Sequence, residues 1–270
     1  FVRGERPLVW KREVPTERLQ LETTRIGLTG DHFHLDATRC SGRIGNASWQ
    51  LGLSGGLAPL FHFGAPGFYT AGFPRKKLLT PAPNLAFDGT ITIGERTIQI
   101  DHWIGLRGHN WGKEHAFSYA YGGCNTWDDG ATDRAIDGFT ARVRLVAGVL
   151  SPWMSGLVYR DAARAVDHNR MRDWFARAVV EPRRWVLPYG DFGLEMDGGS
   201  EAYAGLRYRH PDGKESYCYN TKFASVRVRD GKRVVTSQAG EHEVLYAQPL
   251  PAVPLHPSES WTQSDGDYQS

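Results

Sequence analysis

Residues with the means for acid–base chemistry are concentrated between positions 101 and 115. Two carboxylates, Asp101 and Glu114, lie here with His109, and tryptophans stand between them. A carboxylic acid in an apolar pocket keeps its proton because desolvation raises its pKa, and an aromatic face stabilises a neighbouring cation by about 1 to 2 kcal/mol. Addition of water to an alkene, or its cyclisation, needs both properties. The stretch therefore predicts an acid-catalysed site with Asp101, His109 and Glu114 as catalytic residues.

Other side chains in and beside this stretch are candidates to line the pocket. Aromatic rings supply flat apolar walls, glycines permit bends of the backbone, and amides or a guanidinium can hold a polar group of a ligand. The predicted substrate-binding residues are Trp103, Arg107, Asn110, Trp111, His115, Tyr119, Tyr121, Asn125 and Trp127.

Each catalytic candidate also has a structural interpretation. Asp101 is suited to cap a turn, and Glu114 to form a surface ion pair with Lys113 or Arg107. The histidines could pin a strand crossing through hydrogen bonds, as buried polar groups commonly do. The residue types alone leave these alternatives open.

Metal and nucleotide chemistry are disfavoured by motif order. A zinc site from His102, His109, Glu114 and His115 does not match the HExxH spacing of a helical site. The sequence has no Gly-rich phosphate loop that leads from a strand into a helix, and no serine nucleophile elbow. These observations disfavour a helical zinc site, nucleotide enzymes and esterases.

Composition favours a small apolar ligand as the partner. The 270 residues carry 32 basic and 30 acidic side chains, a net charge of +2, which gives no electrostatic case for nucleic acid. No run approaches the roughly 18 apolar residues of a membrane span, so no integral membrane segment is expected. A cytoplasmic location is expected because no signal segment is visible, although the chain begins at Phe1, which leaves room for an upstream targeting segment. Nothing in the sequence indicates the oligomeric state.

The cysteines are expected to be free thiols. Cys40, Cys124 and Cys218 are odd in number and widely spaced, unlike a disulfide framework or a zinc knuckle.

The elements that must position the site are expected to be strands. Thirty-one glycines, 15 prolines and 12% aromatic residues favour strands and turns. Hairpins are predicted over residues 32–53 and, around Gly94, over residues 88–101. If no bulge intervenes, period-two alternation places Asp101 and His109 on one strand face with Trp103, Arg107 and Trp111. Further strands are predicted over residues 139–147, 185–196, 200–209, 217–229 and 234–246.

Three segments depart from this pattern. Residues 54–84 form an apolar stretch rich in glycine and proline, which is expected to plug one end of a barrel or to cover a ligand. Residues 161–180 show helical spacing, and a turn at 167–169 between two strands is the alternative. Residues 251–270 are expected to form an extended tail.

The motif from Gly105 to His115, GLRGHNWGKEH, resembles a known family. It is similar to the carotenoid hydratase (hydroxyneurosporene synthase), attachment-protein-H-like and tocopherol cyclase-like group. Further similar stretches are KLLTP at 77–81, FDGT at 87–90 and YNTKFA at 219–224. The resemblance implies an all-β fold of two lipocalin-like antiparallel β-barrels packed together, with at most one or two short helices. They would comprise residues 1–130 and 131–250, with a ligand pocket near their junction.

The resemblance also implies a chemistry. Members of the group include hydratases, prenyl-chromanol cyclases and Diels–Alder cyclases that act on bulky apolar molecules without metal or organic cofactor. The first hypothesis is accordingly a lyase or isomerase of hydratase or cyclase type, acting on a terpenoid or polyketide-like substrate. The alternatives are a non-catalytic lipocalin-like carrier and a structural protein with a vestigial pocket. A carboxylic acid that faces the cavity would favour the enzyme, since a carrier needs none.

Overall fold

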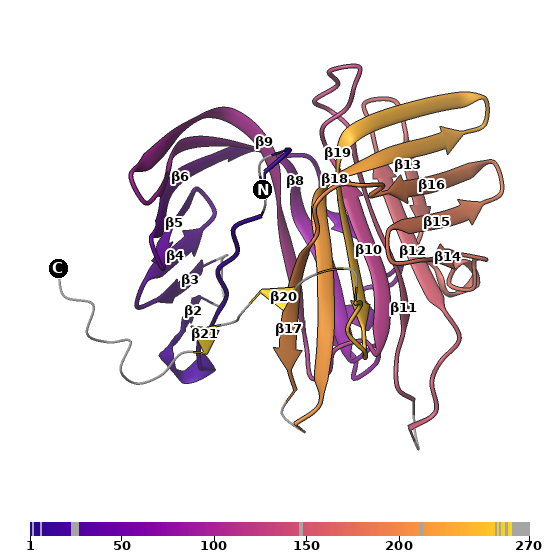
Figure 1. Cartoon of the computed structure of the whole chain (residues 1–270). Helices are drawn as coiled ribbons and strands as arrows, with labels where there is room; N and C mark the ends of the chain where they lie inside the picture. The colour runs from indigo at the N-terminus through magenta and orange to yellow at the C-terminus, as the bar shows by residue number, and fades with distance from the viewer. Residues whose placement is uncertain are drawn as a thin grey trace. The chain divides into compact units, whose positions relative to one another are not determined.

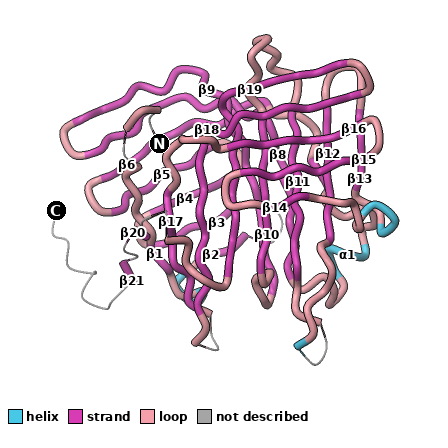
Figure 2. The backbone as a smooth tube through the Cα atoms, turned by 45° about the vertical axis from the view of Figure 1, so that its right-hand side comes forward, coloured by secondary structure: helices cyan, strands magenta, loops and turns pink. Residues whose placement is uncertain are grey.

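The chain is an all-β protein (Figure 2). The structure is a computed structural model that describes residues 1, 3–5, 7–22, 27–145, 148–210, 213–251, 253, 255–256 and 259–260. In those residues the helical elements are α1 (Gly67–Thr70) and two 3-10 turns, Thr16–Arg18 and Met171–Asp173. The predicted fold class is confirmed, and two large antiparallel sheets agree with the expected pair of lipocalin-like barrels. Within the described ranges, no helix has the length and apolar character needed to span a membrane.

Two compact units interleave along the chain. The first comprises residues 1–7, 56–84 and 106–256, and the second residues 8–55, 85–105 and 257–270. The long strands β8 (Lys76–Ile93) and β9 (Arg96–Gly112) each run from one unit into the other. The boundaries of these units differ from residues 1–130 and 131–250. The division into two barrels at those boundaries stays a prediction.

The first unit is built around an 11-stranded sheet. Its main path runs β13-β12-β11-β10-β19-β18-β16-β15-β14, with β17 paired to β18 (Figure 1). All its pairings are antiparallel except that of β17 with β20. The strands of this unit are β7 (Leu60–Phe61), β10 (Ser118–Cys124), β11 (Ala135–Arg142), β12 (Met154–Arg160), β13 (Ala165–His168), β14 (Val179–Val180), β15 (Arg184–Tyr189), β16 (Phe192–Asp197), β17 (Ala204–Arg209), β18 (Glu215–Asp230), β19 (Arg233–Tyr246) and β20 (Leu255–His256).

The second unit is mainly an antiparallel meander. Strands β2 to β6 pair in chain order, and β6 then pairs with β8 from Ala47–Ile93 to Gly55–Leu85. Its strands are β1 (Arg12–Glu13), β2 (Gln20–Glu22), β3 (Gly27–Gly30), β4 (Phe33–Asp36), β5 (Arg39–Ile44), β6 (Ala47–Gly55) and β21 (Glu259–Ser260). The predicted hairpin around Gly94 is confirmed as β8–β9, whereas residues 32–53 form three strands, β4, β5 and β6, joined by two turns instead of one.

The regular alternation of side chains between the two faces of β8 and β9 is interrupted near the residues where each strand leaves one unit and enters the other. Asn84 and His102 have φ values of 57° and 54°, which are rare for residues other than glycine. The His102 amide donates to Oδ1 of Asp88 at 2.8 Å. Because the regular pleat is broken at His102, a single strand face does not continue from Asp101 to Trp111.

The core of the first unit lies on one face of the 11-stranded sheet. Ala120, Met196, Tyr219 and Val244 are members of its cluster of buried side chains. Gly122 permits this packing, because a Cβ atom there would lie 2.3 Å from the Met196 sulfur. The opposite face of the same strands is therefore free to border a cavity.

Several local predictions need correction. Residues 161–180 contain no α-helix; β13, a 3-10 turn and β14 occupy them, and the turn between β12 and β13 precedes Ala165. Aromatic packing explains the helix-like spacing, since the Trp174 ring lies 5.2 Å from that of Phe68. Residues 185–196 form two strands, β15 and β16, joined at Gly190. The three cysteines are free, as expected. Most of the predicted tail lies outside the described residues.

Candidate functional site

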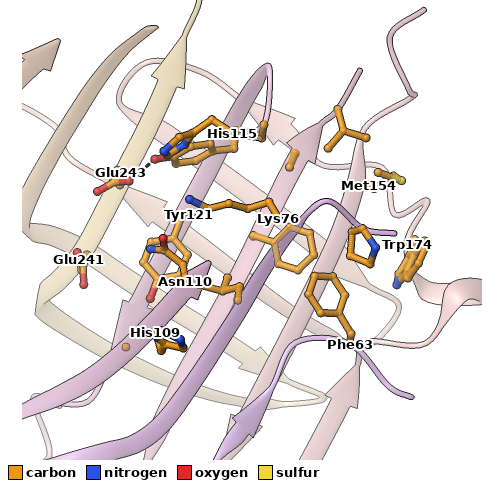
Figure 3. Close-up of a pocket in the computed structure, with 18 of the residues that line it drawn as sticks. Phe63, Lys76, His109, Asn110, His115, Tyr121, Met154, Trp174, Glu241 and Glu243 are labelled. Atoms are coloured by element: carbon orange, nitrogen blue, oxygen red, sulfur yellow. Dashed lines mark hydrogen bonds between the residues drawn. The ribbon is translucent and has the colours of Figure 1, made fainter. Parts of the chain in front are cut away.

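A cavity of about 440 Å³ lies within the first unit. Its walls come from the start of β8, the end of β9, and strands β10, β11, β12, β17 and β19. Figure 3 shows Glu241, Glu243 and Tyr121 on one side and Phe63 and Trp174 on the other. The cavity is therefore amphipathic, with a polar wall facing an apolar one.

The polar wall is built by strand register. In the pairing of β10 with β19, Tyr121 lies opposite Glu243, and the two-residue period puts Tyr119 and Glu241 on the same face. The Tyr119 hydroxyl donates a hydrogen bond to the Glu243 carboxylate. Burial raises the pKa of Glu243 above its usual range, although the Tyr119 hydrogen bond opposes this shift. The site therefore holds a carboxyl group that is biased toward its protonated form beside an apolar space.

The neighbouring carboxylate, Glu241, differs in its partner. Its Oε1 forms an ion pair with the Lys222 ammonium. Of the two glutamates on this wall, Glu243 is the one hydrogen-bonded to a tyrosine and Glu241 the one paired with a lysine.

A second buried acid lies on the same sheet face. Asp137 of β11 is 1% exposed, and its Oδ2 accepts hydrogen bonds from the Thr80 and Tyr121 hydroxyls. The other oxygen, Oδ1, lies 3.2 Å from Nε2 of the buried His62. Tyr121 therefore connects the cavity to an inner polar cluster, which orients its ring.

A lysine also borders the cavity. Lys76 of β8 is half-buried, and burial lowers the pKa of its amine, although the negative charge of Glu243 acts in the opposite direction. Its neighbour Lys77 is buried and donates to the carbonyl oxygens of Ala71 (2.8 Å) and Pro74. Lys77 thus holds the preceding turn in place, while Lys76 faces the cavity.

The apolar wall uses the segment that the sequence marked as a plug or a cover. Phe63 and Phe73 from residues 54–84 line the cavity together with Met154 and Trp174. Trp174 is held by a hydrogen bond of 3.3 Å from its Nε1 to the Asn169 carbonyl. The segment is therefore part of the wall itself.

Several predicted site residues do meet at this cavity. They are His109, Asn110, His115, Tyr119 and Tyr121. The His109 ring stacks on Trp111 with 4.7 Å between ring centroids, and burial lowers the pKa of its imidazole. A mainly neutral His109 can accept or donate a hydrogen bond to a polar ligand group.

The remaining predicted site residues are not among those that line this cavity, and their roles stay predictions. Asp101 and Trp103 are exposed and belong to the second unit. Glu114 is exposed and forms an ion pair with Arg75, as the surface interpretation expected, though with another partner. Trp127 is in the hydrophobic core. Arg107, Trp111 and Asn125 are not among the lining residues, although Trp111 supports His109.

Sequence reasoning missed the acid and the lysine of the cavity. Glu241 and Glu243 alternate with His242 and Val244, a pattern that normally indicates a solvent-facing strand surface. Lys76 stands in a run of three basic residues with no sign of burial. These side chains are partly desolvated because they border a cavity, and that position depends on pairing between strands distant in the sequence.

A zinc site from His102, His109, Glu114 and His115 is disfavoured by the order of these residues. Among the described residues there is no group of three or more histidine, cysteine, aspartate or glutamate side chains placed to hold a metal ion. His102 lies in the second unit, whereas His109, Glu114 and His115 lie in the first.

Comparisons with known proteins bear on the fold. No family model matches the chain. Two uncharacterized proteins of Mycobacterium tuberculosis, MT0513 of strain CDC 1551 and Rv0493c of strain H37Rv, are each 24% identical to it over 198 residues, 72% of the chain. The chain spans 58% of the length of these relatives. The crystal structure of a candidate AttH from Nitrosomonas europaea matches with a TM-score of 0.50 at 14% identity, over 81% of this chain and 68% of that one. The two proteins thus share an all-β fold.

Proposed function

We propose that the protein is a cofactor-independent enzyme of hydratase or cyclase type, which acts on a bulky apolar, terpenoid or polyketide-like substrate. The observation that carries the proposal is Glu243, a carboxyl group with a raised pKa that faces an amphipathic cavity. A carrier of apolar molecules has no use for such a group, whose burial costs free energy. An acid catalyst requires it.

In this proposal Glu243 is the proton donor. It transfers its proton to an alkene carbon of the substrate, and the Tyr119 hydroxyl stabilises the carboxylate that remains. The faces of Tyr121, Phe63 and Trp174 surround the cationic carbon that forms. Water, or a nucleophilic group of the substrate, then adds to the cation, and the proton it loses returns to Glu243. The acid is regenerated without any other reactant.

His109 and Asn110 would position the nucleophile. Both line the cavity at the end of β9 and carry groups that can hydrogen-bond a water molecule or a substrate hydroxyl. His109 is suited to this role because burial keeps its imidazole mainly neutral, so that one ring nitrogen accepts a proton or hydrogen bond.

A carrier function is the second candidate. The apolar wall of Phe63, Met154 and Trp174 and the volume of about 440 Å³ suit a medium-sized hydrophobic ligand. If the protein is a carrier, its activity is ligand binding, and replacing the acid by a neutral amide would leave that binding unchanged.

The test separates conversion from binding. The protein is incubated with a panel of isoprenoid alkenes, and products that have gained water or have cyclised are detected by mass spectrometry, while binding is followed by quenching of tryptophan fluorescence. We expect Glu243→Gln to lower turnover by about 100-fold to 10,000-fold with nearly unchanged binding. Glu241→Gln is the matched control on the same strand face, and it should retain turnover. Binding without conversion by the unaltered protein across the panel would favour the carrier.

A further inference from the structure

Lys76, which lines the cavity, differs in its partners from two other lysines, its chain neighbour Lys77 and Lys222, which pairs with a glutamate of the cavity wall. The Lys77 ammonium is bound by two backbone carbonyls, and the Lys222 ammonium is paired with Glu241. No hydrogen bond or salt bridge holds the Lys76 ammonium within the part of the chain that the structure describes. Figure 3 shows its side chain extending across the cavity toward β19, which carries Glu241 and Glu243.

This placement combines the features of a nucleophilic lysine. Partial burial beside apolar side chains favours the neutral amine, which has a free electron pair. A carboxyl group that can donate and accept protons lies on the facing strand. An amine that lacks an internal partner has its nitrogen available to a ligand.

We propose that the cavity binds apolar aldehydes or ketones covalently, through an imine between the carbonyl carbon of the ligand and Nζ of Lys76. The reaction uses the same cavity and the same Glu243 carboxyl group as the proposed alkene chemistry, but it does not depend on turnover of any alkene substrate.

The chemistry balances with groups that are present. The Nζ electron pair attacks the carbonyl carbon, and the oxygen takes up a proton from Glu243 to give a carbinolamine. The nitrogen then releases a proton to the Glu243 carboxylate. Loss of the hydroxyl with a second proton expels one water molecule and forms the C=N bond, and the iminium proton returns to the carboxylate. Overall, one C=O bond is replaced by one C=N bond, one water is released, and no oxidant or reductant is required.

The surroundings of Lys76 define the ligand class. Phe63, Met154 and Trp174 occupy the side of the cavity away from the two glutamates (Figure 3). When the carbonyl carbon of a ligand is bound to Nζ, the rest of the ligand can occupy this apolar side of the cavity. A carbonyl compound with a hydrophobic tail or ring fits better than a small or charged one.

Reductive trapping tests this proposal on the full chain. The protein is treated separately with cinnamaldehyde and with propanal in the presence of sodium cyanoborohydride, and modified lysines are identified by peptide mass spectrometry with fragmentation. We expect Lys76 to react about tenfold faster than any other lysine. We also expect cinnamaldehyde to react faster than propanal at Lys76 but not at the surface residue Lys232, because only Lys76 adjoins an apolar wall.

Matched variants complete the experiment. Lys76→Arg keeps a long side chain with N–H donors but cannot form the imine, so it should abolish the fast labelling, whereas Lys222→Arg should leave it unchanged. Equal labelling of all lysines overturns the proposal, as does failure of both aldehydes to modify Lys76. An equal rate of cinnamaldehyde and propanal at Lys76 overturns the assignment to apolar ligands. The outcomes that overturn the proposal are all measured on the unaltered chain, so folding defects of the variants do not affect them.

Discussion

Two adjacent residues of β19, His242 and Glu243, are titratable groups in partly or fully desolvated positions on opposite faces of one strand. His242 is fully buried, with its Nδ1 2.7 Å from the Tyr203 hydroxyl. Glu243 faces the cavity and accepts a hydrogen bond from Tyr119. Burial lowers the pKa of His242 to about 4 and raises that of Glu243, so desolvation favours the neutral form of both.

The two residues differ in whether a ligand can reach them. A ligand in the cavity can reach the Glu243 carboxyl, whereas closely packed side chains surround His242, whose Nε2 has no hydrogen-bond partner in the described structure. The same physical effect therefore produces a candidate acid catalyst on one face and a stability cost on the other. Whether the side chain borders the cavity decides between these outcomes. Asp137 differs from Glu243 in the same way, because it is buried and does not line the cavity.

Asp137→Ala should give the largest loss of stability. Removal of this buried carboxylate leaves the hydroxyls of Thr80 and Tyr121 and the ring of His62 without their shared partner. We expect the free energy of unfolding to fall by about 3 to 5 kcal/mol, measured by urea denaturation. The exposed residue Asp31, which contacts Arg18, provides the control Asp31→Ala, whose effect should be below about 1 kcal/mol. Equal effects of the two substitutions would refute the structural role of Asp137.

The next largest effect is the pH dependence caused by His242. Because its pKa is about 4 in the folded chain and near 6.5 in the unfolded chain, the unfolded state binds the extra proton between these values. Stability is therefore lost as pH falls from about 6.5 toward 4, by up to about 3 kcal/mol. His242→Gln should remove this part of the slope when unfolding is measured at pH 7 and at pH 4.5. An unchanged difference between the two pH values would show that His242 does not titrate as its burial implies.

Glu243 should produce a pH dependence of the opposite sign. Its pKa is raised in the folded chain, so the folded state retains a proton that the unfolded state loses, and stability falls as pH rises through the folded-state pKa. Relative to the unaltered protein, Glu243→Gln should thus become more stable as pH increases from 4.5 to 8. The change should be about 1 kcal/mol or less, since the cavity allows water to reach the group. Thermal unfolding across this range would detect it, and a change of the opposite sign would mean that Glu243 is ionised more easily in the folded chain.

The sequence predicted the fold well because strand and turn signals are local. The hairpin around Gly94 follows from alternating isoleucines and one glycine, and the structure confirms it. The titratable and aromatic stretch that the sequence singled out also contains residues that line the cavity, among them His109 on β9 and Tyr119 on β10. What could not be predicted depends on distant parts of the chain: Glu243 faces Lys76 only because β19 pairs with β10 and the sheet encloses a space. Periodicity identifies alternate faces, but it does not show that a polar face borders a cavity.

Asp101→Asn should have the smallest effect. It tests whether a carboxyl group that does not line the cavity has any role in turnover. Residue type and neighbours favour Asp101 as the proton donor, yet its side chain is exposed on the second unit and is not among those that line the cavity. We expect a change in unfolding free energy within about 0.5 kcal/mol and unchanged turnover in the assay used for Glu243→Gln. If instead Asp101→Asn removed turnover while Glu243→Gln did not, the acid would have to be assigned to the second unit. The same two carboxyl groups thus decide whether position relative to the cavity, or local sequence context, identifies the catalytic residue.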